Sequence, residues 1–128
     1  MKNENQVSSL VPSKQLKDLG VKQESIWVYV DTPRGYNLIL NRPDSDIFKC
    51  SREQISAFTV AELGEMLAKY NKNRDFVVTN FDNEEDFEWI CQIQRFDSDD
   101  YIGETFYAES EADARAKMLI YLIKNKLV

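Results

Sequence analysis

The hydrophobic positions along the chain follow two different periods, which predict helices in some segments and strands in others. Leucines at helical spacing predict a first helix that Ser9 caps and Gly20 ends. A second apolar stripe predicts a helix over residues 60–70. Thr59 and Glu62 form the capping-box pattern immediately before that stripe, which fixes where the helix begins.

A third helix is predicted over residues 111–125, with Ser110 and Asp113 in the spacing of a second capping box. Acidic residues in its first turn and lysines in its last turn complement the helix dipole. Its expected buried stripe consists of Ala112, Ala116, Leu119, Ile120 and Ile123.

The first two segments with a strand pattern are predicted to form a hairpin. Residues 26–30 and 36–40 are rich in β-branched, aromatic and aliphatic side chains, and the turn between them contains Pro33 and Gly35. The short apolar segment 47–50 is interpreted as a third strand.

The second half of the chain shows the alternation of a sheet with one buried face. Strands are predicted over residues 76–79, 87–93 and 101–108, and Ile90 breaks an otherwise regular alternation in the middle strand. We expect the closing helix to cross the last two strands. The side chains expected together in the core are Trp89, Cys91, Phe106, Leu119 and Ile123.

These elements predict an α+β fold in one globular domain spanning residues 1–128. A chain of 128 residues is long enough to bury a core without a disulfide or metal. No βαβ spacing is present, so a single antiparallel sheet of four to six strands with three packed helices is expected.

The charge is distributed unevenly along the chain. Residues 82–113 contain 12 acidic residues and one basic residue, whereas the whole chain has a net charge of −6. The candidate acidic interaction surface consists of Asp82, Glu84, Glu85, Asp86, Asp97, Asp99 and Asp100. Such a surface repels nucleic acid, and its simplest interpretation is a pair of solvated loops. The alternative is an acidic surface that mimics nucleic-acid phosphates.

No pattern of catalytic, cofactor or metal chemistry is present in the sequence. Histidine is absent, and the two cysteines, Cys50 and Cys91, belong to no CxxC pair. The segment 97–108 begins like a calcium loop, but it lacks the glycine and the final glutamate of an EF-hand. Four glycines form no phosphate-binding loop. We therefore predict no catalytic residues, no cofactor and no metal site.

The chain has neither an apolar run of membrane-spanning length nor the apolar core of a secretory signal. We expect a cytoplasmic protein that binds neither membranes nor nucleic acid directly. We expect it to be a monomer or weak homodimer with an unidentified protein partner.

Three segments are similar to a group of small proteins encoded in bacteriophage and prophage regions of gut bacteria. They read VSSLVPSKQLKDLGVKQESIWVYV, ISAFTVAELGEMLAKY and ESEADARAKMLIYLIKNKLV, and the resemblance covers most of the chain except the loops near Asp44 and Asp82. The resemblance implies a mobile-element origin and transfers no catalytic residue to this chain. We therefore expect an accessory protein that acts by protein–protein interaction. An acidic inhibitor of a host nucleic-acid-binding protein is the alternative.

Overall fold

The computed structural model describes residues 6–70, 75–82 and 88–128. Within these ranges the fold is α+β and contains helices and two antiparallel three-stranded sheets. The elements in chain order are α2 (Leu10–Asp18), β1 (Trp27–Thr32), β2 (Gly35–Leu40), α3 (Asp46–Cys50), β3 (Gln54–Ala57), α4 (Val60–Leu67), β4 (Phe76–Asp82), β5 (Glu88–Gln94), β6 (Tyr101–Ala108) and α5 (Glu111–Lys124).

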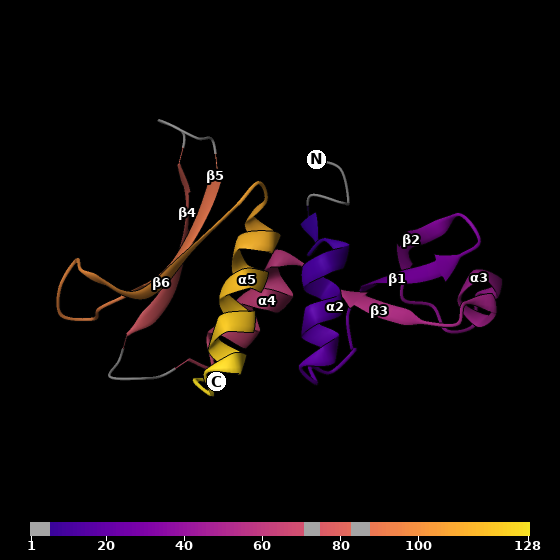
Figure 1. The fold of residues 1–128 in the computed structure, drawn as a ribbon, viewed down its shortest axis with the longest axis horizontal. Helices are drawn as coiled ribbons and strands as arrows, with labels where there is room; N and C mark the ends of the chain where they lie inside the picture. Colours follow the sequence, from indigo (N-terminus) through magenta and orange to yellow (C-terminus); the bar gives the residue numbers. More distant parts are fainter. Residues whose placement is uncertain (1–5, 71–74, 83–87) are drawn as a thin grey trace.

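The helices separate the two sheets. Figure 1 shows α2, α4 and α5 in the middle of the molecule, the sheet β2-β1-β3 on one side and the sheet β4-β5-β6 on the other. The helix α5 contacts α2 and α4 as well as all three strands of the second sheet. This central helix therefore joins the two halves of the molecule.

The expectation of one sheet with four to six strands is wrong in detail. The six described strands form two separate sheets, of which only β4-β5-β6 has the order of a meander, and the described residues contain four helices where the sequence predicted three. Each sheet needs its own apolar cover, because one face of an antiparallel sheet must pack against another layer. The helices between the two sheets supply that cover on both of their sides.

The interpretation of residues 47–50 as a strand is also wrong. This segment is the short helix α3, in which the hydroxyl of Ser45 accepts a hydrogen bond from the backbone N–H of Phe48. The third strand of the first sheet is β3, which pairs with β1 in antiparallel register. The capping serine is a local signal that outweighs the apolar character of Ile47 and Phe48.

The capping box expected at the start of α4 is formed, and the one expected at the start of α5 is formed only in part. Thr59 and Glu62 make both hydrogen bonds of the capping box at the start of α4. At the start of α5, Ser110 accepts from the backbone of Asp113, but the carboxylate of Asp113 does not complete the box. It accepts instead from the backbone N–H of Ser9 at 2.7 Å.

The ends of α2 show how local sequence sets a boundary. Ser9 occupies the N-cap position, but its side chain makes no capping hydrogen bond. Gly20 has a positive φ of 89°, and its N–H bonds to the carbonyl of Lys17. The N–H of Val21 bonds to the carbonyl of Leu16, which completes a Schellman motif. The predicted end of this helix at Gly20 is confirmed.

The predicted core forms around α5. Cys91 and Leu119 are buried, and Trp89, Phe106 and Ile123 pack against the same cluster while remaining partly accessible. The predicted contact of the closing helix with the last two strands is confirmed.

One face of the second sheet packs against this core, and alternating side chains of its strands point into it. Cys91 pairs with Phe106, and Ile93 pairs with Ile102, so a bulge lies between these two pairs. Glu104 lies within the bulge and is exposed, although its position in a regular strand would face the core. The bulge therefore keeps a carboxylate out of the apolar layer. The expected start of β5 at Phe87 lies outside the described residues.

No helix in the described part of the chain is both long enough and apolar enough to cross a membrane.

Candidate interaction surface

The buried thiol is chemically inert. Cys91 is fully buried, and desolvation raises the pKa of its thiol to about 11. The hydroxyl of Thr79 lies 3.7 Å from its sulfur. A thiol with this pKa stays protonated at neutral pH, so it is not a nucleophile. Cys50 is exposed, and neither cysteine forms a disulfide.

Within residues 6–70, 75–82 and 88–128, no three cysteine, aspartate or glutamate side chains come together in a way that could hold a metal ion. The described acidic residues are distributed over helices, loops and strands.

The candidate acidic surface is divided between opposite ends of the second sheet. Asp82 ends β4 opposite Glu88, where β5 begins. Asp97, Asp99 and Asp100 are exposed in the loop that follows the other end of β5. Six residue steps along β5 separate these ends, a distance of about 20 Å. The remaining candidates, Glu84, Glu85 and Asp86, lie outside the described residues.

The outer face of the second sheet lies between these two acidic ends. Strand alternation and the register place Val78, Ile90, Tyr101 and Tyr107 on the face opposite Cys91. These four residues are called the outer strip below. Figure 1 shows the described helices only on the other side of this sheet. The outer strip is thus an apolar and aromatic surface without a covering layer in the described part of the chain.

Exposure confirms that the strip is accessible. Tyr107 exposes 53% of its surface and Tyr101 exposes 48%, whereas Val78 and Ile90 are half-buried. Polar amides from Asn80, Gln92 and Gln94 share this face. The strip therefore combines rigid aromatic groups with adaptable hydrogen-bonding groups, a combination that is common in protein-binding surfaces.

The second sheet is strongly anionic. The strands β4, β5 and β6 contain no lysine or arginine, and their only charged residues are Asp82, Glu88 and Glu104. The loop 95–100 adds three aspartates and Arg95. On α5, the ammonium of Lys117 donates to the backbone carbonyl of Tyr107 at 2.7 Å.

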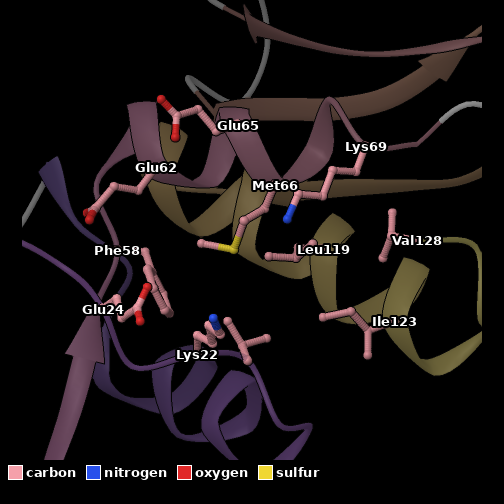
Figure 2. A pocket seen from close by; sticks show the side chains of 11 residues that line it. Lys22, Glu24, Phe58, Glu62, Glu65, Met66, Lys69, Leu119, Ile123 and Val128 are labelled. Atoms are coloured by element: carbon pink, nitrogen blue, oxygen red, sulfur yellow. The ribbon is translucent and has the colours of Figure 1, made fainter.

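A separate groove of about 460 Å³ lies on the helical side of the molecule, between α4, α5 and the segment after α2. Figure 2 shows the ammonium groups of Lys22 and Lys69 pointing toward an apolar floor that includes Met66 and Leu119. Glu62 lines the same groove, but both of its oxygens accept backbone hydrogen bonds. The groove carries charges of both signs and favours no single class of ligand.

Sequence reasoning identified the acidic ends of the sheet and missed the outer strip between them. The available signal was Ile90, an apolar residue where alternation calls for a polar one. Tyr101 and Tyr107 flank the inward-facing Ile102 and Phe106 at strand spacing, so their outward orientation was also predictable. These apolar and aromatic residues at outward positions together indicate an apolar sheet face.

Comparison with known proteins gives no relative from which a site could be transferred: no protein-family model, no curated protein and no solved structure matches this chain.

Proposed function

We propose that this chain is a protein-binding accessory protein whose contact surface is the outer strip of the second sheet. The observation that carries the proposal is the exposure of Tyr101 and Tyr107 on a sheet face that no described helix covers. Soluble monomers rarely expose large contiguous apolar patches, and aromatic residues dominate the energy of protein interfaces. The proposal includes no catalytic step, cofactor or metal.

The test compares proteins retained by the tagged wild-type chain with those retained by the double variant Tyr101→Thr/Tyr107→Thr. Threonine keeps the preference for a strand while removing both rings. A partner that acts through the strip is retained by the wild type and lost with this variant. The matched control is Val11→Thr/Ile26→Thr, which removes apolar groups that are 68% and 59% exposed and lie outside the second sheet. Loss of the same partner with the control variant would contradict the proposed surface.

Mimicry of nucleic-acid phosphates remains the second proposal, and the placement of the described acids argues against it. A phosphate mimic requires a continuous row of carboxylates, whereas Asp82 and Asp99 lie at opposite ends of β5 with apolar residues between them. The two proposals differ in outcome. Mimicry requires that Asp97→Lys/Asp99→Lys/Asp100→Lys removes the partner and that the double tyrosine variant retains it. Loss of binding with the tyrosine variant contradicts mimicry.

A further inference from the structure

We infer that the occupant of the outer strip is an apolar segment of a partner protein that carries lysine or arginine at both of its ends. The inference rests on the proposed protein-binding function and adds the chemistry of the partner. Its basis is the arrangement of three surface regions along β5. Acidic residues lie at one end, the outer strip lies in the middle, and acidic residues lie again at the other end.

The charge at both ends selects for a basic partner. Among the described residues, Glu88 and Asp82 occupy one end, and Asp97, Asp99 and Asp100 occupy the other together with the cation Arg95. Basic side chains placed against both ends gain electrostatic attraction, and acidic side chains there are repelled. The exposed position of the loop aspartates makes this attraction dependent on salt.

The distance between the acidic ends defines the length of the segment. About 20 Å along β5 corresponds to about 14 residues of α-helix or about six residues of extended strand. A helix of that length can place one apolar face over Tyr101 and Tyr107 while its terminal basic residues reach the two acidic ends. The inferred occupant is therefore short, apolar on one side and basic at its termini.

The same charges disfavour the other occupants of an apolar sheet face. A second copy of the chain would stack one anionic sheet on another, and both ends of each sheet are acidic in either orientation. Anionic lipid surfaces and nucleic acid are repelled for the same reason. In addition, the strands lack the lysines and arginines with which aromatic platforms hold nucleic-acid phosphates.

The test titrates the isotopically labelled full chain with a synthetic amphipathic peptide of about 14 residues, which has leucines on one helical face and a pair of lysines at each end. A twin peptide with glutamates in place of the lysines measures the contribution of charge. We expect the lysine peptide to shift the amide signals of Ile90, Gln92 and Tyr107 and to bind at least about tenfold more tightly than the twin. Equal affinity for both peptides, or shifts confined to other elements, would overturn the inference.

Neutralising variants then test the two ends. Glu88→Gln combined with Asp97→Asn and Asp99→Asn should weaken binding of the lysine peptide about tenfold and reduce its dependence on salt. The matched control neutralises three acids on other elements, Asp18→Asn, Asp44→Asn and Glu65→Gln, and should bind as the wild type does. Equal losses in both triple variants would indicate attraction by net charge alone and would contradict the inferred site.

Three further measurements address the other occupants and separate the two proposals. Vesicles containing phosphatidylserine and a single-stranded oligonucleotide should leave the amide signals of the strip unshifted. Sedimentation at increasing concentration should show no self-association through the strip. Shifted strip signals in either titration, or self-association through the strip, would overturn the inference. A cellular partner that is lost with Tyr101→Thr/Tyr107→Thr but docks through an acidic segment would refute the basic partner and leave the proposed function standing. Retention of every partner by that variant would refute both.

Discussion

A β-carbon at Gly64 would lie 2.5 Å from Nη1 of Arg115, so the glycine on α4 creates the space that the guanidinium on α5 occupies. That Nη1 donates to the carbonyl of Val60 at 3.2 Å, and Nη2 lies 3.1 Å from the carboxylate of Glu111. The arginine therefore joins the first turn of α4 to α5. A helix that carries glycine in its interior gives up intrinsic stability, and here the vacant space accommodates a contact between two helices.

This relationship predicts strong coupling between the two positions. In an Arg115→Met background, Gly64→Ala should raise the free energy of unfolding by about 1 kcal/mol, since alanine favours the helix. In the wild-type background the new methyl group displaces the guanidinium from the Val60 carbonyl, so the gain should disappear or reverse. Denaturant melts of the four proteins measure the coupling. Effects that add to within about 0.3 kcal/mol would contradict it.

A second prediction concerns Asp113, whose carboxylate holds the backbone N–H of Ser9 at 2.7 Å. This hydrogen bond connects the beginnings of α2 and α5 across 104 positions of sequence. Asp113→Ala should lower the free energy of unfolding by about 1–3 kcal/mol, because it leaves a partly buried N–H without its charged acceptor. Asp113→Asn should recover part of the loss, since its amide oxygen can still accept.

Chemical denaturation measures the free energy of unfolding of the Asp113 variants, and Glu109→Ala serves as the control. Glu109 is an exposed acid just before the cap of the same helix, and its replacement should change stability by less than about 0.5 kcal/mol. A loss of the same size in both alanine variants would assign the effect to the helix dipole and exclude the bond to Ser9.

The third prediction tests the core around α5. Leu119 is 2% exposed, and Leu119→Ala should cost about 2–5 kcal/mol through lost burial and the cavity that remains. Val11→Ala, at a helical position that is 68% exposed, serves as the control for the change in side-chain size alone. Equilibrium melts that show a cost below about 0.5 kcal/mol for Leu119→Ala would mean that the helix is not packed there.

The elements that local chemistry specifies could be predicted from the sequence. Gly20 ends α2 with a positive φ, and Thr59 with Glu62 starts α4, because each boundary depends on hydrogen bonds between near neighbours. The hairpin of β1 and β2 and the antiparallel pair of β5 and β6 also follow from short-range patterns. These signals depend on neighbouring residues, so the tertiary contacts of the chain did not change them.

The division into two sheets could not be predicted, because it depends on which strands pair across long separations. The strand β3 is only four residues long, and its pairing partner β1 lies more than 20 residues earlier in the chain. The bond from Ser9 to Asp113 is equally invisible in the sequence, since the spacing of Ser110 and Asp113 predicts a capping box within α5 itself. The outer strip is hard to predict because Ile90 alone looks like an exception to the alternation of its strand.

The last prediction concerns pH. The carboxylate of Asp31, near the end of β1, accepts hydrogen bonds from the hydroxyl of Ser51 and from the backbone N–H groups of Arg52 and Glu53. The Ser51 hydroxyl is the largest cause that lowers the pKa of Asp31 below 3.8, and the backbone donors add to it. The charged form therefore organises the turn that leads from α3 into β3.

A lowered pKa in the folded state means that Asp31 contributes stability at pH values above 3.8 and loses this contribution as the pH falls through the folded-state pKa. Asp31→Asn should therefore lower the melting temperature at neutral pH, and the difference from the wild type should shrink as the solution is acidified. Thermal melts between about pH 7 and pH 2 measure this, with Asp18→Asn on the exposed face of α2 as the control. A difference that stays constant with pH would show that the amide fails for geometric reasons and that the charge of Asp31 does not stabilise the turn.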